Sequence, residues 1–210
     1  MIRLLIADDH PIVREGLRRI AADQPGITVV AEAQTADEAL ARMSQAPVDV
    51  MLLDVSMPGP GFIEVLQQVR RDHPTVKVLV LSVHPEDQWA VRALRAGAAG
   101  YLTKDHSPEQ LIEAIRRVYR GSKYVTAALA EKLATGLEAG GGVTPHETLS
   151  DREYEVLRGL GAGLSVKDIA ARLNLSSKTV STYRSRILEK MQLRTNADLV
   201  RYVRDHALGD

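Results

Sequence analysis

Five polar side chains in the first half of the sequence stand where apolar runs end. They are Asp8, Asp9, Asp54, Ser82 and Lys104. Carboxylates held close together repel one another, and a hard divalent cation such as Mg²⁺, which prefers oxygen ligands, removes that cost. The same ion and a lysine would stabilise the charge of a transferring phosphoryl group, which a carboxylate can accept as an acyl phosphate. The sequence therefore predicts a phosphoryl-acceptor site in which Asp54 is the acceptor and Ser82 donates a hydrogen bond to a phosphoryl oxygen.

Each of these residues also has a simpler explanation when it is taken alone. Asp8 and Asp9 can cap a helix that begins near Pro11, and Asp54 can be an ordinary loop residue. His10, beside the acidic pair, is better explained as a residue at the start of that helix than as a metal ligand. The joint placement of the polar residues at strand ends is what favours a site over these alternatives.

The elements that must position these residues follow from the hydrophobic pattern. Five apolar runs, each followed by a stretch with helical periodicity, are "IRLLIA", "ITVVAEA", "VDVMLL", "VKVLVLS" and "AGYLT". Near-continuous apolar runs are typical of parallel strands that are covered on both faces. We therefore predict an α/β fold with a doubly wound, five-stranded parallel sheet. Ligands bind such sheets at the carboxyl ends of the strands, near the point where the strand order reverses, and this edge would gather the polar residues.

The repeated strand-and-helix pattern ends after Tyr119, and three segments are predicted. Residues 1–121 form the phospho-acceptor domain. Residues 122–146 form a linker with one helix over about 126–138, followed by the flexible, glycine-rich "AGGGVTP". Residues 147–210 form a small all-helical domain.

Helix starts are marked by hydroxyl residues three positions before a carboxylate or an amide. This pattern predicts capping boxes at Thr35–Glu38, Ser107–Gln110, Ser150–Glu153, Ser165–Asp168 and Thr195–Asp198. A further helix is expected to begin at Ser176. The tail therefore contains four short helices.

Composition excludes several classes of function. The 210 residues include no cysteine, so disulfides, thiolate metal sites and cysteine nucleophiles are excluded. No apolar run approaches the ~20 residues of a membrane span, and no signal peptide is evident at the start. We expect a cytoplasmic protein that does not associate with a membrane. The net charge is zero, which argues against a non-specifically basic protein.

One helix of the tail concentrates positive charge. Between Ser176 and Arg194 there are five basic side chains and one acidic side chain, Glu189. Stepping about 100° per residue, one side of this helix is apolar and the other carries polar side chains. We predict that the polar side enters the major groove of double-stranded DNA, where small polar side chains meet base edges and basic ones hold phosphates. The predicted contacts are Lys178, Thr179, Ser181, Thr182, Ser185, Arg186 and Lys190.

Two alternatives apply to the tail. A charged helix face can simply be solvated, but the excess of basic residues and the preceding helix and turn favour DNA. The glycines of "GLGAGLS" (159–165) resemble a nucleotide-binding motif, but no strand precedes them. A turn between two helices is the better interpretation.

The first half of the chain resembles the receiver domain of two-component response regulators. The resemblance lies in "ADDH", "LLDVSMPG", "LSVH" and "GYLTKD", and it covers about residues 1–120. It implies that Asp54 is phosphorylated by a cognate sensor histidine kinase. It also implies that Asp9, Asp54 and the carbonyl of Ser56 bind Mg²⁺ and that Asp8 acts through water. Tyr101 matches the aromatic switch position of the family.

This sequence departs from the receiver pattern at one position. The family usually has glycine two residues before the glutamate of the helix after the acceptor, whereas this chain has Phe62 there and Gly61 one place earlier. We therefore expect a different loop shape and helix start at this position, with the acceptor unchanged.

The tail resembles the LuxR-type helix-turn-helix of the NarL/FixJ family, from "LSDREYEVL" through "TVSTYRSRILEKM". Tyr183 replaces the histidine common at its position. The resemblance implies that the phosphorylated form is a homodimer on promoter DNA. The last helix, "NADLVRYVRDHA", carries more apolar residues than one face needs. We predict that Leu199, Tyr202 and Val203 form the dimer contact, and that Val200 and Ala207 face the tail's own core.

Three functions remain to be compared. A phosphorylation-switched transcription regulator uses every feature above, with each domain inhibiting the other until Asp54 is phosphorylated. Such a protein is not an enzyme apart from catalysing its own phosphoryl transfer and slow dephosphorylation. A phosphohydrolase would need a second carboxylate two residues after Asp54, where Ser56 stands. A regulator that works without phosphorylation would not need the complete set of polar residues.

Overall fold

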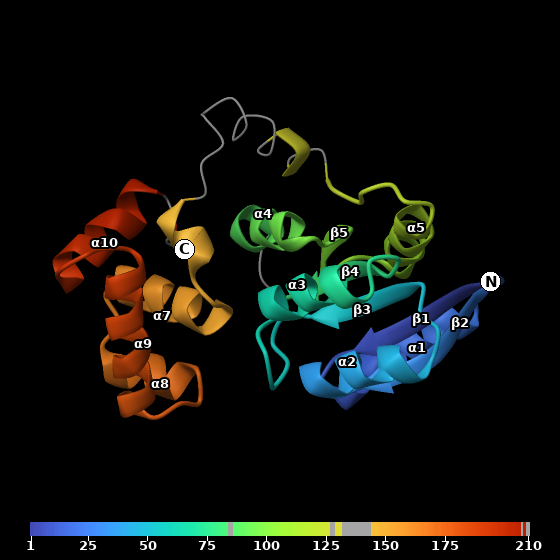
Figure 1. The fold of residues 1–210 in the computed structure, drawn as a ribbon, viewed down its shortest axis with the longest axis horizontal. Helices are drawn as coiled ribbons and strands as arrows, with labels where there is room; N and C mark the ends of the chain where they lie inside the picture. Colours follow the sequence, from blue (N-terminus) through green and yellow to red (C-terminus); the bar gives the residue numbers. More distant parts are fainter. Residues whose placement is uncertain (84–85, 127–128, 132–143, 207, 209–210) are drawn as a thin grey trace. The chain divides into compact units, whose positions relative to one another are not determined.

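The computed structural model describes residues 1–83, 86–126, 129–131, 144–206 and 208. The chain divides into two compact units, residues 1–141 and residues 142–210 (Figure 1). The helix expected over about 126–138 falls largely outside the described residues, and the segment boundaries at 121 and 146 stay predictions. Among the described residues, no helix is long and apolar enough to cross a membrane.

The first unit contains one parallel sheet of five strands. The strands are β1 (Ile2–Ala7), β2 (Ile27–Ala33), β3 (Val50–Asp54), β4 (Lys77–Ser82) and β5 (Gly100–Thr103). Their order in the sheet is β2-β1-β3-β4-β5, and every pairing is parallel. The predicted fold class is confirmed. The strand order reverses between β1 and β3, so the carboxyl ends of these strands border a crevice in which a ligand can bind.

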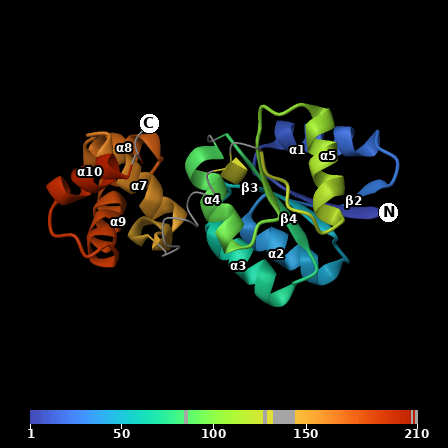
Figure 2. The same ribbon diagram turned by 90° about the horizontal axis from the view of Figure 1, so that it is seen from above.

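Helices cover both faces of the sheet (Figure 2). On one side lie α1 (Pro11–Ala22) and α5 (Pro108–Tyr119), and on the other lie α2 (Ala36–Gln45), α3 (Phe62–Asp72) and α4 (Glu86–Ala96). Strand β3 is buried at every residue, as its continuous apolar run predicts. Successive side chains of β3 point to opposite faces of the sheet, so they pack into two apolar layers, one beneath the helices on each side. The layers hold the strand ends in fixed positions.

The loop after β3 leads into α3 at the position where the sequence departs from the receiver pattern. Helix α3 begins at Phe62 with Gly61 as its N-cap residue, which makes no side-chain cap. Phe62 is buried, and its ring packs against Trp89 of α4 at a centroid distance of 5.7 Å. The preceding Gly59 has φ +108°, a left-handed conformation that favours glycine. Phe62 therefore anchors the start of α3 through packing, where a capping side chain is absent.

The second unit contains a short 3₁₀ helix and four α-helices. These are η1 (Pro145–Thr148), α7 (Asp151–Gly161), α8 (Val166–Arg172), α9 (Ser177–Lys190) and α10 (Asn196–Asp205). Helices α8 and α9 form a helix-turn-helix in which Asn174 adopts φ +53°. Asparagine tolerates this conformation better than most residues, which allows the tight turn.

The predicted capping boxes are present at four of the five helix starts. They cap α5, α7, α8 and α10. At α2 the hydroxyl of Thr35 caps Glu38 as expected, but the carboxylate of Glu38 accepts a hydrogen bond from the backbone N–H of Gln34 instead. The reciprocal half of the box is therefore displaced by one residue.

Candidate functional site

The carboxyl ends of β1 and β3 bring three carboxylates together. Asp8 and Asp9 follow β1, and Asp54 is the last residue of β3. Asp8 and Asp54 are 1% and 3% exposed. One ligand atom from each of Asp8, Asp9, His10 and Asp54 lies within 4.8 Å of the others. The sheet therefore places the acidic residues as the sequence predicts.

Lys104 joins this group from the loop after β5. Its Nζ lies 2.7 Å from Oδ2 of Asp8 and 3.1 Å from Oδ1 of Asp54. Burial alone would lower the pKa of Lys104, but its hydrogen bonds to Asp8 and Asp54 and their charges raise that pKa above its ordinary value. The ammonium group therefore stays protonated and supplies one positive charge to the site.

One oxygen of the acceptor has no partner. Oδ2 of Asp54 is buried and has no hydrogen-bond partner among the described residues. Burial raises the pKa of Asp54, Lys104 opposes that effect, and the charge of Asp8 adds to it. The backbone N–H of Ser56 lowers the pKa by hydrogen bonding to this carboxylate. A buried carboxylate with one free oxygen is suited to accept a cation or to form a new bond.

His10 lies closer to the acidic residues than the sequence indicated. Its Nδ1 is 2.7 Å from Oδ1 of Asp9 and 4.0 Å from Oδ2 of Asp54. Its backbone N–H donates to Oδ1 of Asp8 at 2.9 Å, and His10 is also the N-cap residue of α1, where its side chain makes no cap. The helix-start interpretation is therefore correct for the backbone, while the imidazole covers the carboxylates.

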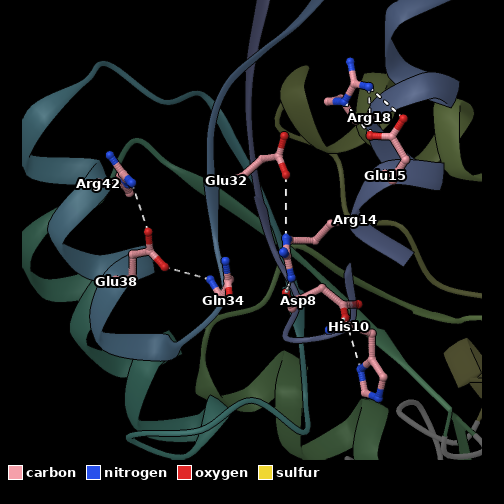
Figure 3. A network of polar contacts seen from close by, with 9 residues as sticks. All are labelled: Asp8, His10, Arg14, Glu15, Arg18, Glu32, Gln34, Glu38 and Arg42. Atoms are coloured by element: carbon pink, nitrogen blue, oxygen red, sulfur yellow. Dashed lines mark hydrogen bonds and ion pairs between the residues drawn. The ribbon is translucent and has the colours of Figure 1, made fainter. Parts of the chain in front are cut away.

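Arg14 of α1 contacts the backbone of the acidic pair and a carboxylate on β2 (Figure 3). Its Nη1 donates to the backbone carbonyl of Asp8 at 2.7 Å, and its Nε lies 3.6 Å from Oε2 of Glu32 on β2. Arg14 is itself only 9% exposed. Sequence reasoning missed this residue, because its contact is to a backbone oxygen and no spacing rule identifies such a contact.

Ser82 lies on β4, next to the acceptor strand β3, and Tyr101 lies on β5, one strand further away. Ser82 ends β4, is 0% exposed, and its carbonyl accepts a hydrogen bond from the backbone N–H of Lys104. Tyr101, on β5, is also 0% exposed. The aromatic ring at the predicted switch position is therefore buried in this structure.

The exposed side of α9 carries the predicted DNA contacts. Lys178, Thr182, Ser185 and Arg186 are exposed, and Thr179 and Ser181 are partly exposed. On the opposite side the apolar residues Val180 and Ile187 are buried. The hydroxyls of Thr182 and Ser185 donate to the backbone carbonyls four residues before them. These hydroxyl oxygens remain able to accept hydrogen bonds.

Lys190 differs from the other basic residues of α9. Its Nζ lies 2.7 Å from Oε2 of Glu153, whose side chain is 3% exposed. The same oxygen accepts a hydrogen bond from the backbone N–H of Ser150 in the capping box of α7. Lys190 therefore has an internal partner, which the sequence did not reveal because 37 residues separate the pair.

The surface predicted for dimer contact needs correction. Leu199 and Val203 are 0% and 2% exposed, whereas Val200, assigned to the core, is 41% exposed. Helix α10 packs on α7 so closely that a side chain at Gly161 would overlap Val203. The helical phase of α10 is rotated from the predicted one, because the close approach at Gly161 draws the Leu199 and Val203 side inward.

Tyr202, the third predicted contact residue, is partly buried within its own unit. Its hydroxyl lies 2.9 Å from Nδ1 of His146, and its ring stacks on His206 at 3.9 Å between centroids. Ala207 lies outside the described residues. The predicted dimer surface is therefore largely used within the unit.

Two protein families match this chain. Residues 4–116 match the response regulator receiver domain, and residues 147–203 match the luxR family of bacterial regulatory proteins. Together these matches include every site residue described above.

Relatives of known name span the whole chain. Response regulator UvrY of Escherichia coli K12 is 38% identical over 209 residues, covering 99% of this chain and 96% of that protein. Response regulator GacA of Pseudomonas aeruginosa is 36% identical over 211 residues, covering 100% of this chain and 99% of that protein.

Solved structures also align along nearly the full length. A structure of the RcsB response regulator of Salmonella typhimurium aligns with a TM-score of 0.65 and 26% identity, covering 97% of both chains. A second structure, RcsB of Salmonella enterica serovar Typhimurium bound to the rprA promoter in the presence of phosphomimetic BeF3⁻, aligns with a TM-score of 0.60 and 26% identity. That alignment covers 96% of this chain and 97% of the other.

Proposed function

The chain belongs to the NarL/FixJ family of response regulators, with a receiver domain followed by a LuxR-type DNA-binding domain. From this premise we propose that phosphorylation of Asp54 controls the binding of the protein to promoter DNA. The observation that carries the proposal is the buried Asp54 carboxylate, which has one oxygen 3.1 Å from the Lys104 ammonium group and the other without a hydrogen-bond partner. An acceptor in this position is held by the sheet and is ready to form one new bond.

The proposed reaction transfers a phosphoryl group from a phosphohistidine of a sensor kinase. The carboxylate of Asp54 forms a bond to phosphorus while the phosphorus–nitrogen bond of the donor breaks, and the imidazole leaves. Lys104, which is protonated, stabilises negative charge on the phosphoryl oxygens as they approach. Ser82 is buried at the end of the neighbouring strand, from which its hydroxyl can donate to one of those oxygens.

A divalent cation fits the donor set. Three carboxylates around one unpartnered buried oxygen carry more negative charge than Lys104 alone compensates, and Mg²⁺ prefers such oxygen ligands. We propose that Asp9, Asp54 and the carbonyl of Ser56 hold it and that Asp8 acts through water. The bound ion would neutralise charge on the transferring group. His10 supplies nitrogen, which Mg²⁺ accepts less readily, and it is not assigned as a ligand.

The output is DNA binding by α9. The exposed side of this helix carries hydroxyls and basic side chains, and it follows the tight turn of a helix-turn-helix. One structural relative, RcsB, was solved bound to a promoter in the presence of a phosphomimetic, which supports the same output here. We propose that the phosphorylated protein acts in the cytoplasm as a homodimer on promoter DNA.

A phosphohydrolase is the competing function for the same carboxylate. It would use Asp54 as its nucleophile, but Ser56 stands where a second, acid–base carboxylate is needed. We propose that the receiver catalyses only its own phosphoryl transfer and slow dephosphorylation.

Incubation with acetyl phosphate and Mg²⁺, followed by intact-mass measurement, tests the proposal. A single adduct that persists for minutes and increases promoter affinity is the expected result. Continuous release of phosphate without an adduct would instead indicate a hydrolase. Failure to react, with DNA binding intact, would indicate a regulator that works without phosphorylation.

A further inference from the structure

The edge of the sheet opposite the acceptor site contains a small cavity whose lining is mostly apolar and includes three basic side chains. Its volume is about 130 Å³, and it lies among α3, the start of β4, the end of α4 and the segment that follows α5. Three basic side chains line it: Arg70, Lys77 and Lys123. No acidic side chain is among the described residues that line it. Lys77 at this edge and Ser82 at the other end of β4 are five residues apart, or roughly 17 Å.

The charges of these cations are not compensated by neighbouring acids. Within the described part of the chain, neither Arg70 nor Lys77 forms an ion pair. The carboxylate of Asp72 binds Arg71 at 2.8 Å, and that of Asp49 binds Arg3 at 2.6 Å. The carboxylates of Asp72, on the same helix as Arg70, and of Asp49, whose carbonyl accepts a hydrogen bond from the backbone N–H of Lys77, are therefore engaged with other arginines.

Two of the cations, Arg70 and Lys123, are exposed residues whose side chains lie against backbone at the cavity. The Arg70 side chain crosses Gly97, which has φ +119°, and a side chain at Gly97 would press against it. The ammonium group of Lys123 donates to the carbonyl of Ala98. Burial, followed by the charge of Lys77, lowers the pKa of Lys123. Holding like charges near each other costs free energy that a bound anion would recover.

We infer that this cavity binds a small tetrahedral oxyanion of the size of phosphate, held by Lys77, Lys123 and Arg70. The cavity volume of about 130 Å³ is well above the ~10–15 Å³ that holds a single water, so an ion of five heavy atoms fits. Ser122 also lines the cavity and offers a hydroxyl donor.

Binding there would affect the segment that leads out of the receiver. The backbone N–H of Tyr124 donates to the carbonyl of Ala99 at 2.9 Å, and Tyr124 forms an isolated bridge with Gly100. An anion shared by Lys123 and Lys77 would tie this segment to β4. We therefore expect the amide of Tyr124 to exchange more slowly when the anion is bound.

Calorimetric titration of the full-length Asp54→Asn protein with inorganic phosphate, in EDTA, tests the inference. The substitution and the chelator remove any contribution from the acceptor site. We expect saturable binding to one site, weakened roughly tenfold by Lys77→Gln or by Lys123→Gln, as the loss of a charge-assisted hydrogen bond implies. Arg18→Gln, which removes an exposed cation of α1 that is paired with Glu15, is the matched control and should bind as the parent does. The same titration with glycerol 3-phosphate shows whether the cavity also binds a phosphomonoester or binds the free phosphate ion alone.

A second measurement does not depend on any variant. The side-chain NMR signal of Lys123 should report a higher pKa in phosphate than in sodium chloride of equal ionic strength, and exchange of the Tyr124 amide should slow. Equal responses to phosphate and chloride, or unchanged affinity in both lysine variants, would overturn the inference.

Discussion

The ammonium group of Lys190, the last residue of α9, lies 2.7 Å from the carboxylate of Glu153 in the first turn of α7. Burial acts to raise the pKa of Glu153, but the hydrogen bond from Lys190 and the backbone N–H of Ser150 lower it overall. Glu153 thus caps one helix and anchors the end of another. The pair fixes where the DNA-facing helix ends relative to the rest of the domain.

Glu153→Gln should destabilise the domain in a pH-dependent way. The amide keeps a cap acceptor but loses the charge that binds Lys190, and a charge-assisted bond contributes about 1.5–3 kcal/mol. Because the pKa of Glu153 is lowered on folding, its stabilising effect is present above the ordinary value for glutamate, about 4.3, and is lost as pH falls through the folded pKa. Urea unfolding from pH 7 to 3 should show the difference between wild type and variant shrinking as pH falls. Glu155→Gln, beside it on α7 and paired with Arg152, is the control and should show a much smaller difference.

Asp54→Asn should abolish labelling by acetyl phosphate while leaving the fold intact. The amide of asparagine lacks the anionic oxygen that attacks phosphorus, so no acyl phosphate can form. The substitution also removes one of two buried negative charges that lie close together, Asp54 and Asp8, so we expect no loss of stability. Intact mass gives the adduct, and circular dichroism gives the fold. Asp72→Asn makes the same chemical change at an exposed carboxylate on α3 and should label as wild type does. Wild-type labelling of Asp54→Asn would mean that another residue is the acceptor.

Lys178→Ala and Thr182→Ala should alter sequence preference, each by about 1–3 kcal/mol where the side chain contacts a base edge. Both residues are exposed on α9. Arg186→Ala should weaken binding to all sequences alike and reduce the salt dependence, because it removes a phosphate contact. Fluorescence anisotropy with specific and scrambled duplexes at several salt concentrations separates the two effects. Arg201→Ala, an exposed cation of α10 paired with Asp198, is the control for charge alone. Unchanged affinity and preference in both Lys178→Ala and Thr182→Ala would place the DNA on another face.

The fold and the acidic site were predictable because both depend on local patterns. Continuous apolar runs identified the parallel strands, and parallel strands deliver their carboxyl-terminal residues to one edge. Contacts over long sequence separation were not predictable. Lys190 and Glu153 are 37 residues apart, and no sequence pattern links residues at that separation. The hydrogen bond from Arg14 goes to the backbone carbonyl of Asp8, so the side-chain types at these positions do not predict it. The phase of α10 was mispredicted because a glycine on a different helix, Gly161, decides which side of α10 comes close.

The burial of Leu199 and Val203 on α10 changes how the proposed dimer must be tested. Leu199→Asp or Val203→Asp would place a charge in the core of the domain and unfold it, so a monomer would carry no information about pairing. Leu199→Ala should already cost about 2–5 kcal/mol of stability, as truncation of a buried leucine does. Val200 is 41% exposed on α10, and Val200→Asp should change stability by no more than about 0.5 kcal/mol.

Val200→Asp is therefore the informative variant. If α10 pairs two copies on DNA, the phosphorylated variant should stay folded but bind a two-half-site operator with lower affinity, while its affinity for a single half-site is unchanged. Light scattering of phosphorylated wild type, free and on the operator, should give the mass of a dimer. Arg204→Asp, an exposed change on the same helix, shows whether added negative charge alone weakens DNA binding. A phosphorylated wild type that remains monomeric in both conditions would exclude the dimer, and a dimeric Val200→Asp would place the contact away from this side of α10.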